Sequence, residues 1–209
     1  SNPEQMIRCM EKNEFKLMVW ECPWLSEGSP VFKEAQQKGY MLRDSKGELV
    51  RDFGYRVDLT NPEAYQWWKE RNRKLLRMGV HSFLLDFGES IPGRLYLGFK
   101  DNYEMFGYDS DDIQPPEAIY YNGKTEREMN NSFPTLYHRA VYESVQEEGL
   151  EGKVYVLARS GFTEMQKYSA VFTGDQASSF EGMKAAMRAM QSLGLCGMPY
   201  AAHQNGGIY

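Results

Sequence analysis

The sequence predicts an α/β fold built on a parallel sheet, either a barrel or an open doubly wound sheet. The clearest observation is an unbroken apolar run, Phe83 to Leu85, which suits a strand covered on both faces. The run stops at Asp86, so a carboxylate stands where the strand surfaces. A second observation is that the order of strand, polar terminus, loop and helix recurs along the chain. In both kinds of fold, functional residues gather at the carboxyl ends of the strands.

The N-terminal elements have clear local signals. Residues 4–12 are expected to form a short helix, and residues 16–20 to form a strand. Residues 31–38 follow Ser29 and a proline, and Gly39 comes directly after them, which is the pattern of a capped helix. This segment therefore supplies one strand and two helices.

A strand–helix–strand unit follows. Residues 57–59 are expected to form a short strand, and residues 63–78 an amphipathic helix that ends at Gly79. The helix leads directly into the strand that ends at Asp86. Short joints of this kind imply parallel strands joined by a right-handed crossover.

Periodicity fails between residues 93 and 124, where Tyr, Gly, Asp and Pro are frequent. We interpret this stretch as an irregular insertion, a loop subdomain that follows the strand ending at Asp86. Regularity returns with a helix over residues 134–148. A second buried strand over residues 154–158 then ends on Arg159.

Two more strands have polar ends. Residues 169–172 give a weak strand signal before Asp175, and residues 199–202 precede His203. Between them, residues 181–193 are expected to form a helix whose methionine stripe packs in the core. Four strands in succession therefore end on a polar side chain, and these side chains are Asp86, Arg159, Asp175 and His203.

Composition excludes several classes of function. The net charge is −5, and acidic and basic residues are interspersed along the 209 residues, which gives no basic field for nucleic acid. No apolar run is long enough for a membrane span, and the first residues are too polar for a signal peptide. We therefore expect a protein with no nucleic-acid partner and no membrane partner.

The three cysteines are widely spaced and form no C-x-x-C pair, which favours neither a disulfide framework nor a metal site. We expect no metal and no cofactor, and a reducing, cytoplasmic location. One glycosylation sequon at Asn130 points the other way, so a secreted or lysosomal form of a longer parent stays open. The sequence leaves the oligomeric state undetermined.

The strand-end residues point to chemistry on sugars. Two separated carboxylates, with an arginine, a histidine and the aromatic Trp20 nearby, suit hydrolysis of a glycosidic bond. One carboxylate attacks the anomeric carbon, while the other protonates the leaving oxygen and later activates water. Each residue also has a purely structural alternative: Asp86 or Asp175 as a cap, Arg159 as an ion-pair partner, and His203 as a buried histidine.

Short motifs run in order through nearly the whole chain: Lys-Leu-Met-Val-Trp at 16–20, Leu-Thr-Asn-Pro at 59–62, Leu-Asp-Phe-Gly-Glu-Ser-Ile-Pro at 85–92, Ala-Arg-Ser-Gly at 158–161, Gly-Asp at 174–175, and His203 with Gly-Gly at 206–207. Together they resemble glycoside hydrolase family 31, which contains α-glucosidases, α-xylosidases and sulfoquinovosidases. Each motif is weak alone, but the ordered set is specific.

The resemblance implies a (β/α)8 TIM barrel, of which the chain supplies about strands 3 to 7 as a single partial catalytic domain over residues 1–209. It also implies a retaining double displacement that hydrolyses terminal α-linked sugars through a covalent glycosyl-enzyme intermediate. Asp86 matches the family's nucleophile and Asp175 its acid/base. The positions that hold the sugar are matched by Trp20, Arg159 and His203.

Two features depart from the family pattern. The family usually has His-Asp-Ile-Gly-Gly near the end, where this chain has Gln204 after His203, and it often has Trp where Phe172 stands. A carboxylate expected near the sugar is therefore missing. Together with the partial barrel, this keeps open the alternative of a non-catalytic carbohydrate-binding or scaffold fragment. The sequence does not name the sugar.

Overall fold

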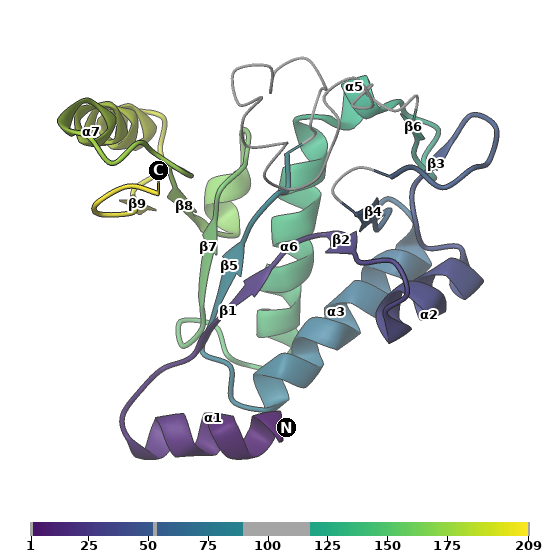
Figure 1. Cartoon of the computed structure of the whole chain (residues 1–209), viewed down its shortest axis with the longest axis horizontal. Coiled ribbons are helices and arrows are strands. Elements are labelled where there is room, and N and C mark those ends of the chain that lie inside the picture. Colours follow the sequence, from purple (N-terminus) through teal and green to yellow (C-terminus); the bar gives the residue numbers. More distant parts are fainter. Residues whose placement is uncertain (1, 52–53, 90–117, 209) are drawn as a thin grey trace. The chain divides into compact units, whose positions relative to one another are not determined.

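The computed structural model describes residues 2–51, 54–89 and 118–208 (Figure 1). The chain divides into two compact units. The first, the sheet unit, comprises Ser1–Cys22, Trp67–Gly88 and Pro134–Tyr209. The second, the loop unit, comprises Pro23–Gln66 and Glu89–Phe133.

The sheet unit is built on five parallel strands in the order β1-β5-β7-β8-β9. Their bounds are β1 Met18–Glu21, β5 Ser82–Leu85, β7 Tyr155–Ala158, β8 Ala170–Phe172 and β9 Ala201–Ala202. Consecutive strands of this sheet are neighbours, as in a (β/α)8 barrel. Within the described residues β1 and β9 are edge strands, so the sheet is an open part of a barrel. The predicted partial barrel is thus confirmed.

The two faces of this sheet differ in burial. In β5, Phe83 and Leu85 are fully buried, whereas Leu84 between them is only partly buried. The register aligns Trp20 of β1 with Leu84, and Leu84 with Leu157 of β7. Residues aligned in register point to the same face of a sheet. One face is therefore covered by apolar packing, and the other presents Trp20.

Four long helices belong wholly or largely to this unit: α1 Pro3–Lys12, α3 Pro62–Arg77, α6 Ser132–Glu147 and α7 Phe180–Leu195, with a 3-10 turn at Met165–Lys167. Each begins and ends within two residues of the predicted bounds. Local caps explain this agreement. Asn2 Oδ1 accepts the backbone N–H of Gln5 at 3.1 Å, and Ser179 Oγ accepts that of Gly182 at 3.0 Å.

The expected core packing of the methionine stripe on α7 is wrong. Met183 and Met187 are 45% and 49% exposed, and Ala186 is the buried residue of this helix. Helical periodicity identified the residues that share a face. It did not reveal whether another element covers that face.

Helices α3 and α6 lie side by side and are joined by ion pairs (Figure 1). Lys69 of α3 is buried, and its Nζ contacts Glu147 and lies 3.0 Å from Glu143 Oε2. Near the end of the pair, Arg77 Nη2 lies 2.8 Å from Glu148 Oε1. The hydrogen bond from Arg77 holds the pKa of the Glu148 carboxyl below its ordinary value. The interface between these helices therefore contains ion pairs, one of them on a buried lysine.

Replacing Lys69 by methionine is expected to lower the free energy of unfolding by about 1–3 kcal/mol, because Glu143 and Glu147 lose their shared cation and face each other as like charges. Denaturant unfolding measures the change. The matched control is Lys167→Met, whose ion pair with Glu164 is exposed and contributes less than about 1 kcal/mol. Equal losses in the two variants would contradict the assignment.

The loop unit contains two antiparallel strand pairs, β2 Trp24–Leu25 with β4 Tyr55–Arg56, and β3 Arg43–Asp44 with β6 Ala118–Ile119. Its helices are α2 Pro30–Lys38 and α5 Glu126–Met129. The strand predicted over residues 57–59 is displaced. The β4 strand ends at Arg56, and Val57 forms only an isolated bridge with Met41.

Arg56 is the central polar residue of the loop unit. It is buried, its Nη1 lies 2.9 Å from Glu126 Oε1, and its guanidinium lies 5.1 Å from the ring centre of Phe133. Residues 118–124 of the predicted insertion fold in this unit, whereas residues 93–117 lie outside the described residues. The described part of the insertion thus packs around a buried ion pair.

Candidate active site

Asp86 follows β5 and is fixed by its neighbours in β1. Its backbone N–H donates to the carbonyl O of Glu21 at 2.9 Å, which extends the parallel ladder by one residue. Trp20 Nε1–H donates to Asp86 Oδ2, also at 2.9 Å. Because Trp20 is 55% exposed, its ring remains open to a ligand while its nitrogen holds the carboxylate.

The other oxygen of Asp86 accepts from two further groups. The Phe87 backbone N–H donates to Oδ1 at 3.0 Å, and Arg159 Nη1 lies 2.9 Å from the same oxygen. The side chains of this ion pair are mostly buried, with 13% of Asp86 and 14% of Arg159 exposed. Groups that belong to three strand ends therefore fix both the position and the plane of one carboxylate.

The turn after Asp86 carries a strained residue. Phe87 has a φ of 51°, in the left-handed region that is uncommon for residues other than glycine. Its ring centre lies 4.2 Å from the Arg159 guanidinium and 6.2 Å from the Trp20 ring, which it meets edge-on. The side chains that hold Asp86 thus also hold the turn that follows it.

Gly88 stands where the turn passes close to α6 and to the residue after Arg159. A Cβ at this position would lie 2.5 Å from Ser160 Oγ and 3.3 Å from Tyr137 Cδ1. Contacts that short force neighbouring atoms to move. A side chain at Gly88 therefore requires Ser160 to change its rotamer and Tyr137 to move slightly.

Replacing Gly88 by alanine is expected to lower the free energy of unfolding by about 1–3 kcal/mol through this overpacking. Gly194→Ala in α7 is the matched control, because a Cβ there meets nothing within 4 Å and alanine favours helix by up to about 1 kcal/mol. Denaturant unfolding compares the two variants. The close approach at Gly88 is refuted if both variants are as stable as the parent.

Asp175 approaches Arg159 from the next strand end. It follows β8 through Gly174, whose φ is 78°, and its Oδ2 lies 3.9 Å from Arg159 Nη1. The same nitrogen contacts Asp86, so two carboxylates share one cation. Asp175 is 39% exposed, three times as much as Asp86. The arrangement sets a fixed, mostly buried carboxylate near an accessible one.

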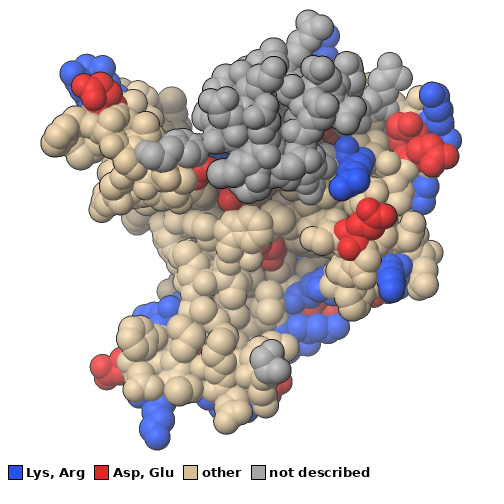
Figure 2. All heavy atoms as spheres, viewed as in Figure 1, with Lys and Arg blue, Asp and Glu red and all other residues tan. Residues whose placement is uncertain are grey.

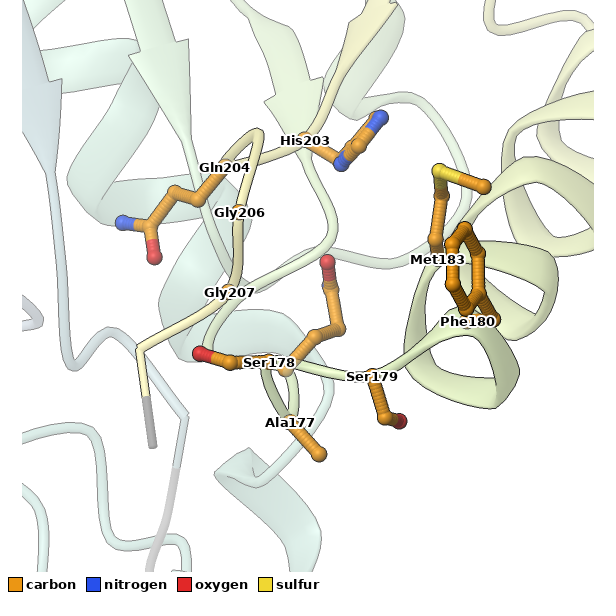
Figure 3. A pocket seen from close by; sticks show the side chains of 10 residues that line it. Ala177, Ser178, Ser179, Phe180, Met183, His203, Gln204, Gly206 and Gly207 are labelled. Atoms are coloured by element: carbon orange, nitrogen blue, oxygen red, sulfur yellow. The ribbon is translucent and has the colours of Figure 1, made fainter.

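His203 lies in a neighbouring pocket of about 250 Å³ that it lines with Gln204 and the start of α7 (Figure 3). Figure 3 shows Met183 and Phe180 side by side on one side of this pocket, with Gln204 pointing away from them. Within the described residues, no hydrogen bond or ion pair joins His203 to the aspartates or the arginine. Of the five predicted site residues, the structure connects four through direct contacts: Trp20, Asp86, Arg159 and Asp175.

One acidic residue next to the site was missed by sequence reasoning. Glu21 ends β1, and its Oε1 accepts the Nε1–H of Trp68 at 2.9 Å. Burial raises the pKa of the Glu21 carboxyl from its ordinary 4.5 to about 7, although the Trp68 hydrogen bond opposes the rise. The sequence contained one signal for this residue, because Glu21 directly follows the predicted strand over residues 16–20. Its partner lies 47 positions away and has no sequence signature.

The face shown in Figure 2 carries no patch of a single charge sign among the described residues. On the face shown in Figure 2, positive and negative side chains of the described residues are interspersed. In the same residues, no three or more His, Cys, Asp or Glu side chains gather in a way that could hold a metal ion. None of the helices in the described ranges is long and apolar enough to cross a bilayer.

Residues 1–208 match the family model for the glycosyl hydrolases family 31 TIM-barrel domain. The chain is 32% identical over 165 residues to the alpha-xylosidase XylQ of Lactiplantibacillus pentosus, which covers 76% of this chain and 19% of that protein. It is 31% identical over 204 residues to the sulfoquinovosidase of Escherichia coli strain K12, covering 93% and 27% of the two chains.

Among solved structures, the chain is similar to a GH31 family sulfoquinovosidase from E. rectale in complex with an aza-sugar inhibitor. The TM-score is 0.82 at 26% identity, and the match covers 98% of this chain and 29% of that one. The chain therefore spans between 19% and 29% of the length of these three proteins.

Proposed function

Because the chain belongs to glycoside hydrolase family 31, we propose that it is the catalytic part of a retaining glycosidase that removes terminal α-linked sugars. The substrate is an α-glucoside, an α-xyloside or a related α-glycoside. The observation that carries this proposal is the pair of carboxylates, Asp86 and Asp175, within reach of one Arg159 nitrogen. Glycoside hydrolysis needs two such groups in different roles.

Asp86 is the nucleophile of the proposed reaction. Its Oδ1 accepts two donors, whereas within the described residues Oδ2 accepts only the Trp20 indole. Oδ2 therefore has the more available lone pair, and it forms the bond to the anomeric carbon as the bond to the leaving oxygen breaks. A fixed carboxylate needs little rearrangement to reach this geometry.

Asp175 is the acid/base. In the first step its carboxylic acid gives a proton to the leaving oxygen, and in the second its carboxylate takes a proton from the water that hydrolyses the glycosyl-enzyme. The second step needs access for water, and the exposure of Asp175 supports this role. Mostly buried Asp86 suits the nucleophile better.

The shared arginine limits the distance between the two carboxylates. Retaining enzymes place the two carboxyl groups about 5–5.5 Å apart, and inverting enzymes about 6.5–9.5 Å apart. Arg159 Nη1 lies 2.9 Å from Asp86 Oδ1 and 3.9 Å from Asp175 Oδ2. The distance between these two oxygens therefore cannot exceed the sum of the two distances. That limit admits the spacing of retaining enzymes and excludes only the wider part of the inverting range.

Replacing Asp86 by alanine is expected to lower kcat/KM for an aryl α-glycoside by about 10⁴-fold or more, because no covalent intermediate forms. Azide added to this variant should yield the β-glycosyl azide by one displacement. Azide added to Asp175→Ala should instead yield the α-glycosyl azide, because it attacks the β-linked glycosyl-enzyme. The measurements are turnover and product stereochemistry in the protein that carries this chain.

Glu164→Gln, on an exposed loop, is the control and should leave turnover unchanged. Unchanged hydrolysis by Asp86→Ala would defeat the proposal. Exchange of the two azide products would reverse the roles of Asp86 and Asp175. A panel of aryl α-glycosides, run on the parent protein, identifies the sugar.

A second candidate function is carbohydrate binding without catalysis. It is favoured by Gln204, which stands where the family usually has a carboxylate. Calorimetry that detects sugar binding, together with no turnover of any aryl α-glycoside, would select this function. Turnover that depends on Asp86 would exclude it.

A further inference from the structure

Glu21 occupies the face of β1 opposite to Trp20. Consecutive residues in a strand point to opposite faces, so Trp20 turns toward Asp86 while Glu21 turns toward α3. The Glu21 Oε1 accepts the Nε1–H of Trp68 at 2.9 Å. An acidic side chain thus lies between the sheet and a helix, directly behind the candidate site.

The backbone of Glu21 contacts Asp86. Its carbonyl O accepts the Asp86 N–H at 2.9 Å, and it is aligned with Leu85 in the β1–β5 register. Trp20, which precedes Glu21, donates to the Asp86 side chain. Any displacement of Glu21 therefore moves both the backbone and the side-chain support of Asp86.

The surroundings of the Glu21 carboxyl are buried and mostly neutral. Trp68 and Asn72 of α3 and Tyr137 of α6 lie close to it, and each favours its ionised form. Asn72 and Tyr137 are almost fully buried, and Tyr137 packs edge-on against Trp68 with ring centres 6.2 Å apart. Tyr137 also adjoins the turn at Gly88. The same aromatic side chain thus borders Glu21 and the turn after Asp86.

The charged groups around this carboxyl do not offset its burial. Arg71 on α3 favours the ionised form, but burial outweighs it and raises the Glu21 pKa to about 7. Burial raises the pKa of Tyr137 well above its ordinary value, and the charges of Glu21, Cys22 and Asp86 add to that rise. Ionised Glu21 would therefore add a negative charge to a region that already contains Asp86.

We propose that Glu21 is a positioning residue: its carboxyl group, through the hydrogen bond from Trp68, anchors the end of β1 to α3, so that Trp20 and Asp86 keep their geometry, and a full negative charge on this group between sheet and helix disturbs that geometry. The catalytic consequence rests on the proposed glycosidase function. The positional consequence does not, because it concerns only the Trp20–Asp86 hydrogen bond. Near neutral pH, the ionised fraction of Glu21 then sets how well Asp86 is held.

The first test follows the indole N–H resonances of Trp20 and Trp68 by NMR between about pH 5 and pH 9. Both are expected to shift with one common midpoint near 7, the pKa of Glu21. In Glu21→Gln neither should shift with that midpoint, and in the control Glu164→Gln both should. If the Trp68 resonance titrates while the Trp20 resonance does not, Glu21 is only structural and the proposal is overturned.

Trp68→Phe provides a second variant that keeps Glu21. The Trp68 hydrogen bond favours the ionised carboxylate, so its removal is expected to move the Trp20 midpoint to higher pH. A midpoint that stays in place, or moves lower, contradicts the link. This result does not depend on the stability of Glu21→Gln.

The kinetic test compares the pH dependence of kcat/KM for parent and Glu21→Gln. The loss of activity that accompanies ionisation near pH 7 should be absent from the variant, and any remaining alkaline loss should belong to other groups, Asp175 among them. Identical profiles would overturn the catalytic part. If the parent shows no hydrolysis, the proposed function fails, and the indole titration still decides whether Glu21 positions Asp86.

Discussion

The site depends on one guanidinium that holds two carboxylates from different strands. Asp86 and Asp175 would repel each other if both were ionised at this separation, and the Arg159 charge between them offsets that repulsion. Arg159 also lies over the ring of Phe87, the strained residue after Asp86. One side chain therefore fixes the distance between the two acidic groups and the conformation of the turn that carries one of them.

The parallel register makes this contact possible. Leu85 of β5 is aligned with Ala158 of β7, so the residues that follow them, Asp86 and Arg159, emerge at the same level and on the same face. A slip of one residue would turn either side chain into the helix layer. Strand alignment thus places the two side chains side by side, and the close approach of the turn at Gly88 leaves no room for a larger side chain without movement of its neighbours.

The sequence predicted the features whose causes are local. The helix α2 begins where Ser29 Oγ accepts the Phe32 N–H at 3.1 Å and ends at Gly39 with a φ of 69°, and both signals lie in adjacent residues. The polar residues at the strand ends could equally be predicted from the sequence. The two-residue pairs of the loop unit were not, because such strands have no periodicity and exist only through distant partners. Glu21 was missed for the same reason, since only the folded chain brings it to Trp68.

Glu21 also shows how stability and site geometry are linked in this fold. An apolar residue of similar volume would pack between sheet and helix without losing hydration, so a carboxyl group there is the costlier choice. Folding favours its neutral form, because the pKa rises from 4.5 to about 7. Its stabilising contribution is therefore complete below pH 4.5 and is lost as the pH rises through 7. The end of β1 that supports Trp20 and Asp86 thus carries a group whose contribution to stability falls as the pH rises from 4.5 to about 7.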